Sequence, residues 1–172
     1  METTSRSVRA WRALQRLGRC GVCLAVLMGV LGSAQRGHAA MLKMSLEYLA
    51  HTADTVVLGT VTRQVSAWDT PHTAIHTDVT VAVERAILGT PGREVTLRVA
   101  GGIVGGMGMR TSNDATFQDG ERVIVFLDTT VVPASVVGMQ QGKILLQDNM
   151  VTYDGEEMGV EAFLATIQRA VR

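Results

Sequence analysis

Alternation of apolar and polar residues is the main pattern between Asp54 and Gln147, and a period of two is typical of β-strands. In the clearest run, the odd-numbered residues from Ile75 to Val83 are mostly apolar and the even-numbered positions between them are mostly polar. Similar runs cover residues 57–65 and 95–99. These segments predict strands that have one face in a core and the other in water.

Further along the chain, one segment is apolar on both faces. Residues 123–127, Val-Ile-Val-Phe-Leu, predict a central strand that is covered on both sides or lines a closed barrel. Val131–Val137, which is interrupted by Pro133, predicts an edge strand, and Lys143–Gln147 predicts the last strand. Turn-forming residues at 69–71 and 89–92 separate the earlier strands, so we expect six short strands.

Helical periodicity flanks the strands at both ends. Ser45 can cap a short helix over Met44–Ala50, whose apolar residues share a face. A second stripe near the end comprises Val160, Phe163, Leu164, Ile167 and Val171. Glu156 and Glu157 precede that stripe and suit the positive start of a helix. The chain therefore predicts a mainly β fold: a small antiparallel OB-like barrel of about six strands, with a short N-terminal helix and a C-terminal amphipathic helix packed on it.

The first forty residues have the composition of an export signal. Five arginines between Arg6 and Arg19 precede an uncharged stretch from Cys20 to Ala34, and small residues surround position 39. The uncharged stretch has about fifteen residues, whereas a membrane-spanning helix needs about twenty. We expect residues 1–39 to be a signal peptide, cleaved between Ala39 and Ala40, and residues 40–172 to be one exported domain, periplasmic or secreted, without a membrane span.

Removal of this signal changes the composition of the chain. Both cysteines, Cys20 and Cys23, lie within it, so the processed chain has no thiol for a disulfide or a metal. The signal also contains six of the sixteen basic residues but one of the sixteen acidic residues, which leaves ten basic and fifteen acidic residues and a net charge of −5. A chain of this sign, without a basic stripe, is a poor candidate for binding nucleic acid.

A long Gly- and Met-rich connection, from Gly101 to Asp119, follows the third expected strand. Long irregular connections in small domains are often functional. We expect this one to bind a protein partner, such as an exported peptidase or a component of the cell envelope. The expected contact residues are Gly101, Gly102, Ile103, Val104, Met107 and Met109. The glycines lack the lysine and the following helix of a phosphate-binding loop, and we expect no cofactor.

Two pairs of residues suggest a metal-handling alternative. The thioethers of Met107 and Met109 suit Cu(I), and the imidazoles of His72 and His76 suit copper or zinc. No third ligand is evident for the methionines. Four residues of strand separate the two histidines by about 13 Å, which is too far for a single ion. These four residues are the candidates for a copper or zinc site.

Catalytic motifs are weaker still. Asp114, Asp119 and Glu121 lie close together in the sequence, but their spacing does not match a calcium-binding loop. No serine lies in a Gly-flanked turn between a strand and a helix, where many hydrolases place their nucleophile. We therefore expect a protein that is not an enzyme, with no assigned catalytic residue. The alternative is a small hydrolase whose catalytic group the sequence does not reveal.

Four segments carry a further pattern: Ala53–Val61, Ile75–Val81, Ile87–Gly89 and Phe117–Leu127. Together they resemble a family of small exported bacterial proteins of unassigned function and, more remotely, the netrin-type OB-fold domain of tissue inhibitors of metalloproteinases. The resemblance covers residues 45–147 and implies the barrel architecture. Those inhibitors use an amino-terminal cysteine to coordinate the protease zinc. The processed chain has no cysteine, so the resemblance assigns no inhibitory residue to it.

Overall fold

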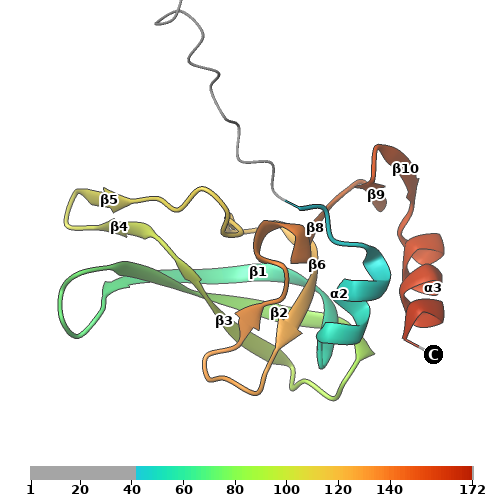
Figure 1. Ribbon diagram of the computed structural model, residues 1–172, viewed down its shortest axis with the longest axis horizontal. Helices are drawn as coiled ribbons and strands as arrows, with labels where there is room; N and C mark the ends of the chain where they lie inside the picture. The colour runs from blue at the N-terminus through green and yellow to red at the C-terminus, as the bar shows by residue number, and fades with distance from the viewer. Residues whose placement is uncertain (1–41, 172) are drawn as a thin grey trace, which may run out of the picture. The chain divides into compact units, whose positions relative to one another are not determined.

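The computed structural model describes residues 42–171, which contain ten strands, two α-helices and one short 3₁₀ helix (Figure 1). The expected signal peptide, with its cleavage residues Ala39 and Ala40, lies outside the described residues. Within them, the mainly antiparallel β fold with a short helix near its start and a helix at its end is confirmed.

The main sheet contains eight antiparallel strands. Seven of them follow the order β10-β9-β8-β6-β1-β2-β3, and β7 pairs with β6 outside this path. Their bounds are β1 (Thr55–Trp68), β2 (Ile75–Leu88), β3 (Glu94–Ala100), β6 (Arg122–Asp128), β7 (Ser135–Val136), β8 (Lys143–Gln147), β9 (Met150–Tyr153) and β10 (Glu156–Gly159). A separate hairpin consists of β4 (Gly102–Val104) and β5 (Met107–Met109).

The main sheet curves back on itself through the segment that leads into β7. Ala134 forms an isolated parallel bridge with Leu97 of β3. The Arg98 N–H donates to the Ala134 carbonyl at 2.8 Å, and the Ala134 N–H donates to the Thr96 carbonyl at 3.1 Å. Strand β7 pairs with β6, so this bridge connects the β6 side of the sheet with β3. A closed barrel would have a continuous ladder of hydrogen bonds at this place, whereas the structure has a single bridge.

Strand β6 is buried on both faces, as its sequence predicts. Ile124 and Phe126 belong to the core beneath the helices, and Val123, Val125 and Leu127 belong to the core inside the curved sheet. All five side chains are fully buried. Burial of each contributes roughly 1.5–3 kcal/mol, so this short strand is a large part of both cores.

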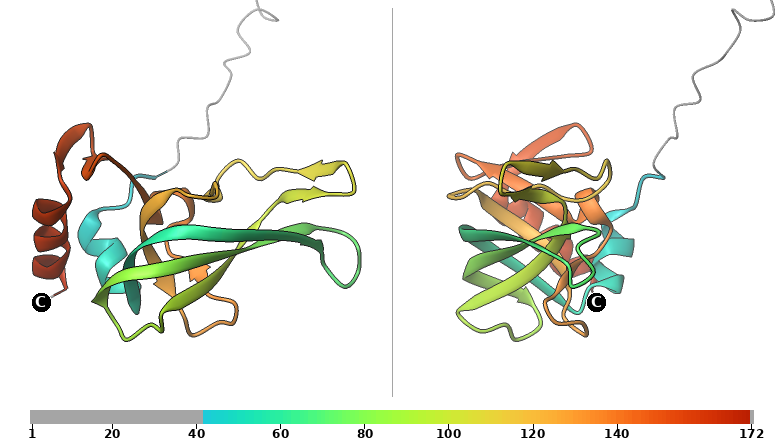
Figure 2. Two further views of the ribbon diagram at one scale, coloured as in Figure 1. Left: turned by 180° about the vertical axis from the view of Figure 1, so that it is seen from behind. Right: turned by 90° about the vertical axis from the view of Figure 1, so that its left-hand side faces the viewer.

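The two α-helices cover the same end of the sheet (Figures 1 and 2). Helix α2 (Leu46–Thr52) begins after Ser45, whose Oγ accepts a hydrogen bond from the Tyr48 N–H at 3.1 Å. Helix α3 (Val160–Ala170) starts at the expected apolar stripe. The side chains that the two helices bury are Leu46, Leu49, Ala50, Val160, Phe163, Leu164 and Ile167.

The structure differs from the sequence prediction just before α3. Glu156 and Glu157 do not begin a helix; they lie in β10, which pairs with β9. Asp154 and Gly155 connect these strands and have positive φ angles of 59° and 79°. Such a pair forms the two-residue turn that matches the twist of a hairpin, so the acidic residues continue a strand.

A second difference lies between β6 and η1 (Met139–Gly142). Only Ser135–Val136 of the expected strand Val131–Val137 is a strand. The residues before it turn back instead, because Thr129 donates through its N–H and its hydroxyl to the Asp54 carboxylate. The additional strands β4, β5, β9 and β10 explain why the described residues contain ten strands where we expected six.

Candidate protein-binding surface

Strands β1 and β2 form a ribbon that extends beyond the core of the sheet. Each strand has 14 residues, but in β1 the fully buried positions end at Val61. The far end of the ribbon projects from the body of the molecule, and the β4–β5 hairpin lies beside it, away from the helices (Figures 1 and 2). Two hairpins therefore project from the same end.

Polar contacts order the turn at the end of the ribbon. The Asp69 carboxylate accepts hydrogen bonds from the Thr73 N–H at 2.7 Å, the Thr73 hydroxyl at 2.8 Å and the Ala74 N–H at 3.0 Å. These bonds, above all that from the Ala74 backbone, lower the pKa of Asp69. The His72 ring stacks on Trp68 with 5.6 Å between ring centroids. The turn thus has a defined conformation without a core beneath it.

The base of the β4–β5 hairpin is fixed against the ribbon. The Gly101 N–H donates to the Ile75 carbonyl at 2.7 Å, and the Thr77 hydroxyl donates to the Gly101 carbonyl at 2.7 Å. Gly102 has a φ of +141°, and a Cβ there would lie 2.4 Å from Thr77 Oγ1 and 2.5 Å from Ser66 Oγ. Only glycine fits this close approach.

Met109, the last residue of β5, also contacts the ribbon. Its Sδ accepts a hydrogen bond from the Ile75 N–H at 3.4 Å. Ile75 is only 1% exposed although it lies at the far end of β2, so the hairpin base covers it. Met109 is therefore part of the support of the hairpin.

The rest of the hairpin is exposed to solvent. Ile103 is 71% exposed and Met107 is 61% exposed. Gly105 and Gly106, with φ angles of 59° and 82°, form the two-residue turn between the strands. Residues 101–109 contain no charged side chain. The hairpin thus presents two large apolar side chains on an ordered base.

The expected partner-contact residues therefore fall into two groups. Ile103 and Met107 are exposed, whereas Gly101, Gly102 and Met109 form the base, and Val104 is half-buried. The sequence predicts an irregular connection from Gly101 to Asp119, but residues 102–109 of it form a hairpin. A Gly-Gly pair between Val104 and Met107 is the signal that indicates a hairpin here.

The structure does not gather the metal candidates into one site. His72 lies in the turn before β2 begins at Ile75, whereas His76 lies on β2. Met107 and Met109 share one face of their hairpin, but Met109 Sδ is directed at the Ile75 N–H. Among residues 42–171, no three His, Cys, Asp or Glu side chains come together as a metal site requires.

The three acidic candidates for catalysis are also separate from one another. Their partners are Thr111 for Asp114 (2.9 Å), Gln64 for Asp119 (3.0 Å) and Lys143 for Glu121. The last of these pairs is largely buried, with Lys143 11% and Glu121 19% exposed. Lys143 Nζ also donates to the Thr116 carbonyl and lies 4.7 Å from the centroid of the Phe117 ring. Through these contacts, Lys143 attaches the segment that follows the β4–β5 hairpin to the start of β8.

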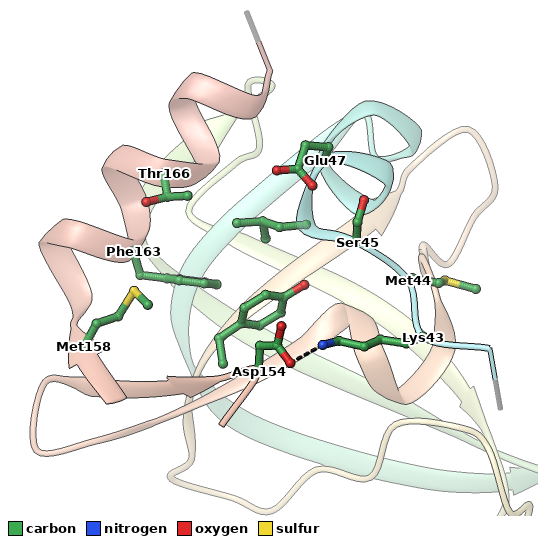
Figure 3. A pocket seen from close by; sticks show the side chains of 10 residues that line it. Lys43, Met44, Ser45, Glu47, Asp154, Met158, Phe163 and Thr166 are labelled. Carbon is green, nitrogen blue, oxygen red and sulfur yellow. Dashed lines mark hydrogen bonds and ion pairs between the residues drawn. The ribbon is translucent and has the colours of Figure 1, made fainter. Parts of the chain in front are cut away.

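A cavity of about 360 Å³ opens at the other end of the molecule, between α2, α3 and the β9–β10 turn (Figure 3). Phe163 is buried in its wall, and Glu47 lies across the opening from the ion pair of Lys43 with Asp154. Burial raises the pKa of Tyr153, whose ring centroid lies 5.3 Å from that of Phe163. Sequence analysis missed this cavity because its walls come from the two ends of the described chain.

Comparison with known proteins adds no relative. No protein-family model matches this chain, and a search of curated proteins finds none similar to it. Among residues 42–171, no helix is both long and apolar enough to cross a membrane. The function must therefore be argued from the surface of the molecule.

Proposed function

We propose that this chain is an exported, non-catalytic binding module that contacts a protein partner through the β4–β5 hairpin. The observation that carries the proposal is the exposure of Ile103 and Met107 on a hairpin whose base is fixed by hydrogen bonds. Side chains on a hairpin whose backbone is fixed at its base cost less entropy to order on binding than side chains on a mobile loop. The register places Ile103 and Met107 on opposite faces of the hairpin, so a partner that contacts both side chains reaches around its exposed edge or tip.

The compartment and the class of partner rest on the sequence. The arginine-rich start and the resemblance to small exported bacterial proteins support export. An exported peptidase or a component of the cell envelope is the partner that this location favours. The curved antiparallel sheet is compatible with the remote resemblance to netrin-type domains, which supports a binding role and assigns no inhibitory residue.

Site-specific crosslinking tests the proposal. A photoreactive amino acid is placed at Ile103 and, as a matched control, at Val132, which is 94% exposed in another loop. Both proteins are expressed with their signal sequence in the source cells, irradiated, and analysed by mass spectrometry. We expect a defined adduct from position 103 that is absent from position 132.

A binding isotherm with the purified partner then gives the decisive result. The double substitution Ile103→Ser with Met107→Ser removes the exposed apolar pair, and Val132→Ser is the control. We expect the double variant to weaken binding by about tenfold or more, since the few central apolar contacts usually dominate an interface. Equal affinity of the double variant and the wild type would reject the hairpin as the binding surface.

A further inference from the structure

The edges of the described sheets differ in how they are protected against pairing with another chain. Ala134 contacts the edge of β3, and Glu156 and Glu157 place two charges on β10. Strand β5 has neither protection, since residues 101–109 contain no charge and no proline. Among residues 42–171, β5 is paired only with β4, and Figure 1 shows it as the outer strand of this hairpin. Unprotected edges are templates for an added strand.

The register of the hairpin identifies which backbone groups face this edge. Val104 and Met107 flank the two-residue turn, and Ile103 is paired with Gly108. In such a hairpin, the pair next to the turn forms the internal hydrogen bonds, and the following pair directs its N–H and C=O groups outward. The N–H and C=O of Gly108 therefore point to the open side of β5.

Access to these groups is unobstructed. Gly108 is exposed, and even a Cβ at this position would meet nothing closer than Ile103 Cγ1, at 3.8 Å. Met107 and Met109 flank Gly108 along the strand. A strand that paired with Gly108 would also contact the exposed Met107 side chain.

We infer that an extended, uncharged segment of the protein partner adds to β5 as a third strand, centred on Gly108. This inference rests on the proposed function and specifies how the same surface binds. Backbone hydrogen bonds would supply affinity, and Met107 and Ile103 would supply contacts that depend on the partner's side chains. The neutral hairpin favours a segment without charges, because a charge paired against apolar groups would lose hydration.

A second copy of this chain fits the edge less well. Strand β5 has three residues, so two β5 edges alone would bury much less than the roughly 1,200 Å² of a stable interface. A segment of a larger partner can pair with β5 while other parts of that partner add contact area. The small area of β5 therefore favours a partner strand over self-association.

Two substitutions at Gly108 isolate the strand pairing. Gly108→Pro removes the outward N–H without removing an internal bond of the hairpin, and Gly108→Ala retains the N–H. We measure the affinity of each variant for the purified partner that crosslinking identifies. We expect Gly108→Pro to weaken binding by about tenfold and Gly108→Ala to change it by less than about twofold. An unchanged NMR signal of the Met109 methyl group confirms that each variant keeps its hairpin base.

A defined probe makes the test independent of that partner. Short random peptides displayed on phage are selected against the whole processed protein, and the tightest peptide is studied by NMR. We expect uncharged sequences, slower amide exchange at Gly108 and cross-strand contacts to Gly108. Failure to select a peptide, or equal binding by Gly108→Pro, overturns strand addition, and contacts between Gly108 of two copies would assign the edge to self-association.

The two failures can be told apart. If Gly108→Pro retains the crosslinked partner while the Ile103→Ser and Met107→Ser variant loses it, strand addition is wrong and the binding surface stands. If all of these variants retain the partner, the proposed function itself is wrong.

Discussion

The two ends of the molecule are stabilised in different ways. At the helix end, α2 and α3 bury a continuous apolar cluster against the sheet. At the hairpin end, Ile75 is fully buried, and hydrogen bonds accepted by the Asp69 carboxylate and donated by the Thr77 hydroxyl and the Gly101 N–H supply the order. The comparison shows that a surface can be kept ordered for binding without a large core beneath it.

This separation has a consequence for the exposed residues. The side chains of Ile103 and Met107 are not needed for the packing of either core. Their substitution therefore affects binding more than stability, whereas the reverse holds at the helix end. Four predictions test this difference, beginning with the largest effect.

Phe163→Ala removes a large side chain from the helix end, where Phe163 is 1% exposed. We expect a loss of about 4 kcal/mol in the free energy of unfolding, since the cavity left in a packed core is only partly refilled. Urea denaturation measures this loss. Ile103→Ala is the control at the hairpin end and should cost less than about 0.5 kcal/mol. Similar losses for both variants would contradict the contrast between the two ends.

Lys143→Met breaks the buried ion pair that attaches the return connection to β8. The Glu121 carboxylate would remain largely buried without its partner, and we expect a loss of about 3 kcal/mol. The double variant with Glu121→Gln should recover much of this loss, because the unpaired charge is then absent. Urea denaturation of the two variants compares them directly. A double variant as unstable as the single one would show that the pair acts through some other contact.

Gly102→Ala tests the fixed base of the hairpin. The new Cβ would clash with Thr77 and Ser66 at a positive φ, so we expect the local opening free energy to fall by about 2 kcal/mol. Hydrogen exchange of the Gly101 amide, which bonds to the Ile75 carbonyl, reports this opening. Gly108→Ala, whose Cβ would make only an ordinary contact with Ile103 at 3.8 Å, should leave the exchange rate unchanged. Equal exchange in both variants would mean that the close contact at Gly102 does not order the base.

Asp78→Asn tests a pH-dependent contact on the ribbon. The hydrogen-bonded Arg98 lowers the pKa of Asp78, so this stabilisation is present at neutral pH and is lost as the pH falls through the lowered value. The pair is partly exposed, so we expect a loss of less than about 1 kcal/mol at pH 7 that becomes smaller as the pH falls below the ordinary pKa of an aspartate. Denaturation measured across this range gives the difference, and a pH-independent difference would exclude the ion pair as its cause.

Much of the helix end could be predicted from the sequence. The stripe from Val160 to Ile167, the Ser45 cap and the apolar run of β6 each have a local pattern that states what is buried. The structure buries the stripe and the apolar run, and it places the exposed Ser45 at the start of α2. These elements obey simple periodicity because each packs a complete face against a core.

The hairpins were harder to predict because their signals are short. Asp148-Asn149 and Asp154-Gly155 have positive φ angles and close the two turns around β9, yet each occupies two residues. The charges of Glu156 and Glu157 would also suit the start of a helix. They lie in a strand because they pair with β9, and this pairing is not visible in the local sequence. The β4–β5 hairpin likewise depends on contacts with Ser66 and Thr77, which are distant in sequence.

Because β6 contributes alternate side chains to both cores, neither core can be lost while the other stays intact. Loss of β6 removes Phe126 from one core and Val125 from the other at the same time. Partly unfolded forms that retain half of the domain are therefore disfavoured, and unfolding of the cores should be a single cooperative transition with the slowest amide exchange in β6. For a protein that we expect to be exported, this cooperativity would limit the time for which apolar strands are exposed to proteolysis.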